Sequence, residues 1–437
     1  MLIVDALIVI LAILIGVRIG GVAVAFTGAA GLAILTFVFG IQPTAPPITV
    51  MLIILAVTSL AGVLQCSGGL DYLVSIAEKI LRNNPNKVTV IAPIVVFAFV
   101  VFTGTSFIAM ALIPVISEVA RGAGVRPERP LSASCAAASY GIAASPLSAA
   151  TAAMIGILGT HGIDFGPMMM VLIPSIFIAI ICGSISVYKR GKELSEDEEF
   201  QRRLASGEIS YNSSGKSYTP TKEARIAVIL FALAVLLILI LGTFKELLPS
   251  WTQNGKVVTL SIANVIEIVA MTAGAIIMVV AKVKPAPVMK SSVFNGGVVA
   301  VMVCFGVCFM TDTFFAFHKN ELIGIFGEVL QNYPWLFAIV LVAMSAILMS
   351  QGATAAALMP LGVSLGIEPT YLVAMAPAIC CTWFFPVHAN ILASVAMDPT
   401  GTMNLGTWIL NHSTMRPGLV TTVCSVVLGF VLASVVF

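Results

Sequence analysis

The chain has 437 residues, of which 59% are hydrophobic and only 10% are charged, and its mean hydropathy is +1.07. A soluble domain cannot bury that much apolar surface, so the composition excludes a soluble protein and indicates a polytopic membrane protein that contacts the lipid bilayer. The formal net charge of +2 is too small to indicate nucleic-acid binding, and the eight cysteines lie in apolar segments, so we expect neither a metal site nor a cofactor.

The first segment is apolar and carries Asp5, with no basic residue before it and no small-residue cleavage site. It predicts a membrane helix rather than a signal peptide. A spanning helix needs about 20 apolar residues, and ten segments meet or approach that length. In chain order they are 2–17, 19–41, 49–66, 130–160, 166–188, 226–244, 257–281, 291–311, 371–396 and 416–437.

Two further apolar stretches are each split by a short polar run. Residues 88–120 are interrupted at Thr103-Gly104-Thr105-Ser106, and residues 333–364 at Ser350-Gln351-Gly352. The arms are too short for a full crossing, which takes about 20 residues. They predict two re-entrant hairpins whose polar tips are buried in protein or line a watery cavity.

Charge gives the expected topology. The segment 189–225 is the only long polar stretch and holds eight basic residues, which predicts a solvated cytoplasmic linker. Counting spans backwards puts the basic residues on both sides of the first hairpin in the cytoplasm, as a hairpin that returns to its own side requires. The second hairpin then opens from the outside, and both termini are periplasmic.

The two halves also share landmarks in the same order. Asn83-Asn84-Pro85, Ala111-Leu112-Ile113-Pro114 and Ser145-Pro146 recur as Asn332-Tyr333-Pro334, Ala357-Leu358-Met359-Pro360 and Phe385-Pro386. Chance similarity among Ala-, Gly- and Pro-rich segments is the alternative. The repeat predicts membrane halves 1–188 and 226–437 joined by the linker 189–225, the layout of a secondary transporter whose site lies between inverted repeats.

Two spans are broken near their middle by proline. The breaks are Ser145-Pro146-Leu147-Ser148 and Phe385-Pro386-Val387-His388. Proline removes a helix hydrogen bond, and the half-helix N-termini that result offer N–H groups to a carboxylate. The alternative is that these residues serve only helix packing. The predicted substrate-binding residues are Thr103, Gly104, Thr105, Ser106, Ser145, Pro146, Ser148, Ser350, Gln351, Thr354, Pro386, His388 and Asn390.

Ionisable residues within the apolar spans are few. Glu267 lies near the middle of 257–281, and Asp312 follows the end of 291–311. A carboxylate in the membrane is costly, so Glu267 is the candidate carrier of a coupling proton, with an interhelical hydrogen bond as the alternative. His388 either titrates near neutrality or is a neutral structural residue. No Lys or Arg lies near the predicted site.

Eight stretches along the chain carry a family resemblance. They are Gly68-Gly69-Leu70-Asp71, Glu78–Pro85, Arg126-Pro127-Glu128-Arg129-Pro130, Ala144-Ser145-Pro146-Leu147-Ser148, Tyr333-Pro334-Trp335, Ser350-Gln351-Gly352-Ala353-Thr354, Gly401-Thr402 and Asn411-His412. With them the chain resembles, over nearly its full length, the anaerobic C4-dicarboxylate transporter (Dcu A/B) family of bacterial inner membranes. The resemblance implies a secondary carrier of fumarate, malate, succinate or aspartate, with ten spans and both termini periplasmic.

The chain departs from the family pattern at the predicted site. The first tip reads Gly104-Thr105-Ser106-Phe107 where the family usually has Gly-Thr-Gly followed by Asn or His. The second break reads Pro386-Val387-His388-Ala389 where the family usually has Pro-Thr-Tyr-Pro. These departures leave the substrate open between a C4-dicarboxylate and a zwitterionic or glycated amino acid such as fructose-asparagine, a substrate that the resemblance also implies for the family.

The predicted fold is an all-α polytopic membrane protein with an inverted repeat of five spanning helices plus one re-entrant hairpin each. Resemblance to the wider ion-transporter superfamily implies alternating access by an elevator motion and a homodimer. The coupling species stays open between a proton, sodium and a counter-substrate. A membrane-embedded enzyme is disfavoured because the chain lacks His-Glu-x-x-His, Gly-x-Gly-Asp and a nucleophile elbow. A channel is disfavoured because the polarity is concentrated at four points.

Overall fold

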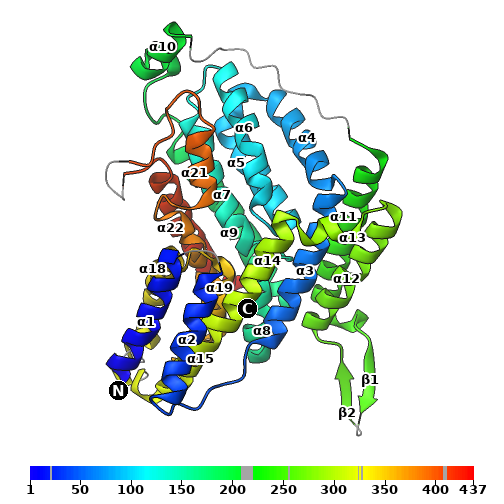
Figure 1. Ribbon diagram of the computed structural model, residues 1–437, viewed down its shortest axis with the longest axis vertical. Coiled ribbons are helices and arrows are strands. Elements are labelled where there is room, and N and C mark those ends of the chain that lie inside the picture. Colours follow the sequence, from blue (N-terminus) through cyan, green and yellow to red (C-terminus); the bar gives the residue numbers. More distant parts are fainter. Residues whose placement is uncertain (20–21, 208–219, 254–255, 323, 326–327, 407–410) are drawn as a thin grey trace.

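The computed structural model describes residues 1–437 except 20–21, 208–219, 254–255, 323, 326–327 and 407–410. The described chain is helical almost throughout, and seven of its helices are long and apolar enough to cross a membrane. The first half, drawn from blue to green in Figure 1, contains α1 (Leu2–Ile19), α2 (Ala23–Phe37), α3 (Ile48–Cys66), α4 (Gly69–Arg82), α5 (Val88–Thr103), α6 (Phe107–Gly122), α7 (Glu128–Ala143), α8 (Ala149–Leu158) and α9 (Phe165–Ser186).

The second half repeats this order. Its elements are α11 (Lys222–Thr243), α12 (Ile262–Val280), α13 (Pro285–Met289), α14 (Ser292–Val303), a π-helix (Cys304–Cys308), α15 (Phe309–Phe317), α16 (Lys319–Leu322), α17 (Glu328–Asn332), α18 (Leu336–Leu348), α19 (Gln351–Ser364), α20 (Pro369–Met375), a 3-10 helix (Ala376–Trp383), α21 (Ala389–Ala396) and α22 (Met415–Val436). The connection between the halves holds α10 (Glu198–Ala205), and two strands, β1 (Ser250–Gln253) and β2 (Lys256–Thr259), precede α12.

Packing follows the repeat. Helix α1 packs on α2 as α11 packs on α12, and α5 packs on α7 as α18 packs on the 3-10 helix after α20. The second arm of each hairpin also contacts the broken helix of the other half: α6 contacts α21, and α19 contacts α8. Helices α9 and α22, the last of each half, pack against each other (Figure 1). The predicted inverted repeat, with a hairpin and a broken helix in each half, is confirmed.

Two predicted span boundaries are wrong. The span expected at 257–281 begins only at Ile262, because the residues before it pair as a β-hairpin with Trp251 opposite Val258, and Ser261 Oγ caps α12 by accepting from Asn264 N at 3.2 Å. The span expected to end at 311 continues through the π-helical turn to Phe317. Asp312 therefore lies inside this span and not at its end.

The expected solvated linker is not solvated throughout. Residues 208–219 of it lie outside the described part, but its first part docks on the start of α7. Arg126 Nη1 contacts Asp197 Oδ2 at 2.5 Å, and Arg129 Nη2 contacts Glu193 Oε1 at 2.9 Å. The arginines belong to the Arg126–Pro130 stretch that matched the family. This stretch therefore anchors the linker to the half that carries the first hairpin.

The same stretch also reaches the loop that precedes α22. Glu128 accepts from Ser413 Oγ at 2.8 Å and forms an ion pair with Arg190 Nε at 3.3 Å, and its N–H donates to Thr402 Oγ1 at 3.1 Å. The buried carboxylate of Asp398 holds this loop closed by accepting from Thr402 N at 2.9 Å. The linker and both halves thus meet in one polar layer at the linker side.

Candidate functional site

The first hairpin tip rests against the first helix break. Gly104 has a φ of +71°, and a Cβ at this position would lie 2.6 Å from the carbonyl oxygen of Leu147. Thr103 is buried, and its Oγ1 donates to Phe99 O at 2.7 Å. Thr105 Oγ1 accepts from Phe107 N at 3.3 Å. A left-handed residue without a side chain is thus required here for the tip to reach the break.

The second hairpin tip has the same shape but reaches a different element. Met349 takes the left-handed conformation at a φ of +53°, and Ser350 caps α19 by accepting from Ala353 N at 3.3 Å. A Cβ on Gly352 would lie 3.0 Å from Ala149 Cβ, so the start of α19 touches the start of α8. Thr354 is buried, and its Oγ1 donates to Ser350 O at 2.7 Å.

The first break is held by its own serines. Ser145 is buried, donates to Val101 O of the first hairpin at 2.7 Å and accepts from Leu147 N at 3.2 Å. Ser148 caps α8 by accepting from Thr151 N at 3.1 Å. Pro146 lies buried between them. This hydrogen bonding replaces the helix bonds that the proline removes.

The second break carries a histidine where the first carries Ser148. His388 caps α21, and its Nδ1 accepts from Asn390 N at 3.4 Å, so Nδ1 carries no proton in this arrangement. Asn390 is buried, and its Nδ2 has no hydrogen-bond partner within the described part of the chain. Pro386 is half-buried ahead of them.

Gln351 joins the second hairpin to both broken spans. Its Nε2 donates to Thr382 Oγ1 at 3.3 Å and lies 3.5 Å from the carbonyl oxygen of Ser139. Thr382 belongs to the 3-10 helix before the second break, Ser139 belongs to α7, and their hydroxyls are 3.3 Å apart. Both tips therefore lie at the first break, where the starts of α8 and α19 touch, and α21 of the second broken span contacts α6 of the first hairpin.

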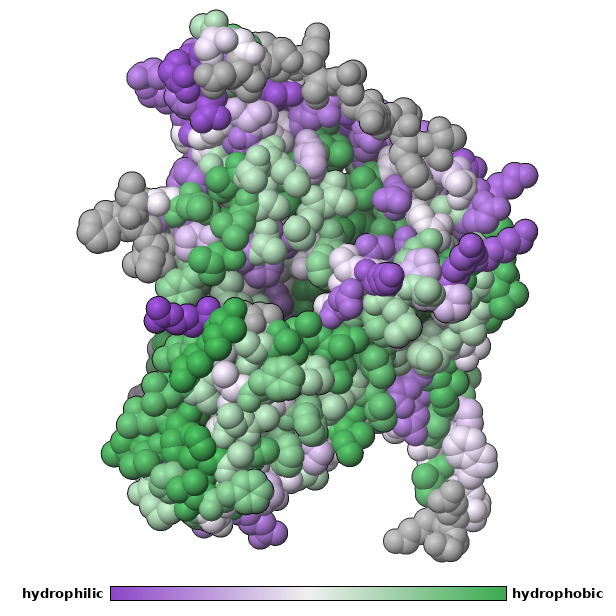
Figure 2. Space-filling view, in the orientation of Figure 1, coloured by the Kyte–Doolittle hydropathy of each residue, from purple (hydrophilic) through white to green (hydrophobic). Residues whose placement is uncertain are grey.

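The surface is hollowed beside this region, between α6 above and α14 below in the view of Figure 2. Phe107 of the first tip borders α14, since a Cβ on Gly296 would lie 3.1 Å from its ring. No Lys or Arg occurs in residues 99–112, 139–152, 345–358 or 380–394. The partial positive charge of the helix N-termini is therefore the fixed positive field that these segments supply.

Most of the predicted hydroxyl groups are already used by the protein. Those of Thr103, Ser145, Ser148 and Thr354 donate to groups in their own tip or break or to a neighbouring arm. Four predicted side chains keep a polar atom without a partner among the described residues: Ser106 through Oγ, Gln351 through Oε1, His388 through Nε2 and Asn390 through Nδ2. These four are the groups available to a ligand.

The structure does not bring Glu267 to the hairpin tips. It lies half-buried on α12, a helix that packs mainly on α3 and α11, and it forms no hydrogen bond with a described residue. Asp312 is better placed, because α15 packs on α19 of the second hairpin and Asp312 Oδ1 is buried without a partner in the described chain. It also follows the π-helical turn, a feature frequent at functional sites.

Sequence reasoning missed Ser139 and Thr382. Both are buried and both contact Gln351, yet neither stands next to a proline or at a hairpin tip. The available signal was weak: α7 carries several Ser residues in an Ala-rich stretch, and Thr382 lies four residues before Pro386. Only the fold brings them to the second tip.

This architecture, with two hairpins and two broken helices meeting between inverted halves, is that of a secondary transporter. The Alcanivorax borkumensis YdaH transporter shares the fold, with a TM-score of 0.50 over 93% of this chain and 89% of that chain at 17% identity. The model of the anaerobic C4-dicarboxylate membrane transporter family matches residues 1–437. The chain belongs to that family.

Relatives match over the full length. The C4-dicarboxylate transporter DcuA of Escherichia coli K12 is 36% identical over 435 residues, covering 99% of each chain. The anaerobic C4-dicarboxylate transporter DcuB of Escherichia coli O157:H7 is 36% identical over 441 residues, covering 99% of this chain and 98% of that protein. DcuA of Wolinella succinogenes is 34% identical over 435 residues, with both chains fully covered. These comparisons do not favour fructose-asparagine, because the relatives are named for C4-dicarboxylates.

Proposed function

We propose that this chain carries C4-dicarboxylates such as fumarate, malate, succinate and aspartate across the membrane by alternating access, as an exchanger or by ion-coupled uptake. The observation that carries the proposal is that two pairs of half-helices, α8 with α19 and α6 with α21, contact each other and carry unpaired polar side chains but no fixed cation. Helix N-termini bind carboxylates through N–H groups and partial positive charge. The names of the full-length relatives support this substrate class.

The paired helix starts suggest how a substrate with two carboxylates is held. One pair is α6 with α21, whose first turns carry Ser106 and Asn390, and the other is α8 with α19, which begins at Gln351. In the proposed complex, one carboxylate takes hydrogen bonds at each pair. Asn390 Nδ2 and Ser106 Oγ serve as donors, and Gln351 Oε1 accepts from the hydroxyl of malate or the amine of aspartate.

The coupling species is proposed to be a proton, sodium or the counter-substrate. Glu267 remains a candidate for proton coupling, and Asp312 joins it because its helix packs on the second hairpin. Glu267→Gln and Asp312→Asn separate the two. The variant that removes the coupling carboxylate flattens the pH profile of uptake, whereas the other keeps it. Two unchanged profiles would exclude proton coupling through either residue.

The motion is proposed to be an elevator-like displacement of the hairpins and broken helices against the remaining helices, within a homodimer in the bacterial inner membrane. Both termini are proposed to be periplasmic. Support comes from the basic residues of 189–225 and from the docking of Asp197 and Glu193 on Arg126 and Arg129, which ties the linker to the hairpin-bearing part.

The test is uptake of labelled succinate into liposomes containing the purified full-length chain and loaded with fumarate. Excess external fumarate or aspartate should compete and internal fumarate should accelerate uptake, since a carrier shows saturation and counterflow. Glutarate, which is one methylene longer, serves as the control for fit between the two helix pairs. Absence of saturable uptake with every C4-dicarboxylate tested would overturn the proposal.

A further inference from the structure

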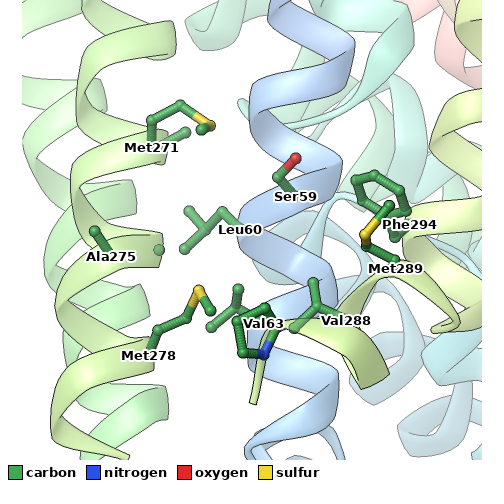
Figure 3. Close-up of a pocket in the computed structure, with 12 residues that line it drawn as sticks. Ser59, Leu60, Val63, Met271, Ala275, Met278, Val288, Met289 and Phe294 are labelled. Atoms are coloured by element: carbon green, nitrogen blue, oxygen red, sulfur yellow. The ribbon is translucent and has the colours of Figure 1, made fainter. Parts of the chain in front are cut away.

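An apolar groove lies on the linker-side half of the helices away from the hairpin tips. Its volume is about 260 Å³. Figure 3 shows α12 along one wall, α3 behind and the short helix α13 along the other wall. The one polar side chain labelled in this view, Ser59, already donates to Leu55 O at 2.7 Å. The labelled apolar side chains that face the groove include Met271, Met278, Leu60, Val63, Val288 and Met289.

Three lysines lie in the segment that connects the two spans at this groove, beside its lining residues Pro285 and Met289. Lys282 and Lys284 follow the candidate span Ile262–Val280, and Lys290 precedes the span Ser292–Phe317, so all three lie where the chain leaves and re-enters the membrane. All are exposed, and none forms an ion pair with a residue that the structure describes. No Asp or Glu occurs between residues 268 and 311. The segment that connects the two spans is therefore uniformly positive.

The backbone of this connecting segment is bent in an unusual way. Lys282 has a φ of +53°, a left-handed conformation that residues with a side chain rarely adopt. This turn ends α12 and sends the chain into α13, whose Val288 is buried against the groove. The turn thereby joins an apolar slot and a cationic segment in one continuous surface.

We propose that this groove binds an anionic phospholipid from the leaflet on the linker side, with one acyl chain in the slot and the phosphate at Lys282, Lys284 and Lys290. An acyl chain brings no polar group that would need a partner in such a lining. Basic pockets at this level of a membrane protein attract anionic headgroups by about 1 kcal/mol for each Lys near the surface. The site lies outside the proposed transport centre and does not depend on the substrate.

A second groove on the same helix provides the contrast. It lies between α11 and α12, is lined by Leu233, Leu237 and Ile276 among others, and also shows almost no polar surface. Its lining residues all belong to the spans Lys222–Thr243 and Ile262–Val280, so no connecting segment with lysines closes it. It has the apolar slot without the cationic segment, which makes it the matched control.

The experiment measures lipid retained by the delipidated full-length chain in detergent, by native mass spectrometry, with dioleoyl phosphatidylglycerol or dioleoyl phosphatidylcholine added. The wild type should retain phosphatidylglycerol in preference. The triple substitution Lys282→Gln, Lys284→Gln and Lys290→Gln should lower that preference about tenfold or more. Lys79→Gln, Lys87→Gln and Lys189→Gln together remove the same charge from other exposed positions on the linker side and should leave it unchanged.

A bulky side chain placed in the groove tests the binding of the acyl chain separately from that of the phosphate. Ala275 lines the groove and is exposed, so Ala275→Trp should displace the lipid without disturbing the core. Thr272→Trp, on the opposite groove of the same helix, should not. Equal retention of the two lipids by the wild type, or equal loss in the two lysine triples, would overturn the proposal. So would unchanged retention in Ala275→Trp, or protection of the groove by a second copy of the chain.

Discussion

At the scale of single residues, the polar groups of the centre divide into those that build it and those that remain available. The hydroxyls of Ser145 and Ser148 complete the backbone hydrogen bonding of the first break. Gln351, in contrast, uses its Nε2 to hold two broken spans and keeps Oε1 unpaired among the described residues. Substitution of a structural serine should therefore reduce folding, whereas substitution of Gln351 should reduce transport.

Gln351→Ala should lower kcat/KM for aspartate uptake about tenfold or more, since the proposed hydrogen bond from the charged amine of aspartate to Gln351 Oε1 contributes about 1.5–3 kcal/mol. The protein level in the membrane should not change. Gln65→Ala is the matched control, because Gln65 Nε2 donates to Ser292 Oγ at 2.9 Å between α3 and α14, away from the tips. Equal losses in the two variants would remove Gln351 from the binding centre.

Gly104 can be tested against another left-handed glycine. Gly104 and Gly124 share a φ of +71°, but a Cβ on Gly104 meets Leu147 O at 2.6 Å whereas one on Gly124 meets nothing within 4 Å. Gly124→Ala should cost about 1–2 kcal/mol in free energy of unfolding, from backbone strain alone. Gly104→Ala should cost more and should also lower succinate transport, measured by thermal unfolding and by uptake. Similar losses of stability with normal transport would show that the tip does not need this contact.

At the scale of elements, the first hairpin and α14 border each other where the surface is hollowed. A Cβ on Gly296 lies 3.1 Å from the ring of Phe107, closer than most real contacts. Gly296→Val should therefore press on the tip and slow transport, while Gly324→Val, at a position where a Cβ meets nothing within 4 Å, should not. The measurement is the initial rate of succinate uptake at equal protein. Normal rates for Gly296→Val would mean that the tip does not slide on α14.

The docking of α10 should depend on Asp197. Partial burial works to raise the pKa of Asp197, but hydrogen bonds from Phe200 N and Arg126 lower it more, so its pKa lies below the ordinary value of 3.8. Because the folded pKa is lowered, the stabilisation is present above that ordinary value and is lost as pH falls through the folded pKa. A spin label on a cysteine at Ala205 should become more mobile over that acidic range.

The same docking can be tested at neutral pH. Asp197→Asn removes the charge that faces Arg126 and should speed trypsin cleavage after Arg202 several-fold, since such a pair contributes up to about 1 kcal/mol. Glu196→Gln, at an exposed neighbour for which no ion pair is seen in the described chain, should not. Unchanged cleavage in Asp197→Asn would mean that the Arg126 contact does not hold α10 in place.

At the scale of the whole molecule, the opposite orientation of the halves fixes which loops share a side. Gln42, after α2, is exposed at the end opposite the linker, and Glu198 starts α10 with a side chain 90% exposed. A cysteine at Gln42 should react with an impermeant thiol reagent in intact cells, whereas one at Glu198 should react only after the membrane is opened. The reverse pattern would invert the proposed topology.

The sequence by itself determined the class, the two hairpins and the two breaks, because hydropathy and proline act over a few neighbouring residues. It also located the tips, since Gly104 and Ser350-Gln351 interrupt otherwise apolar runs. It misplaced the start of α12 and the end of α15, where a β-hairpin and a π-helical turn changed the boundaries.

Only the tertiary structure decided which polar groups form hydrogen bonds within the protein and which stay available to a ligand. Ser145 and Ser106 look alike in sequence, but Ser145 bonds to Val101 of another element while Ser106 finds no partner among the described residues. Ser139 and Thr382 join the centre only because Gln351, far along the chain, reaches both. Such pairings depend on how distant segments pack, and no local pattern of residues records them.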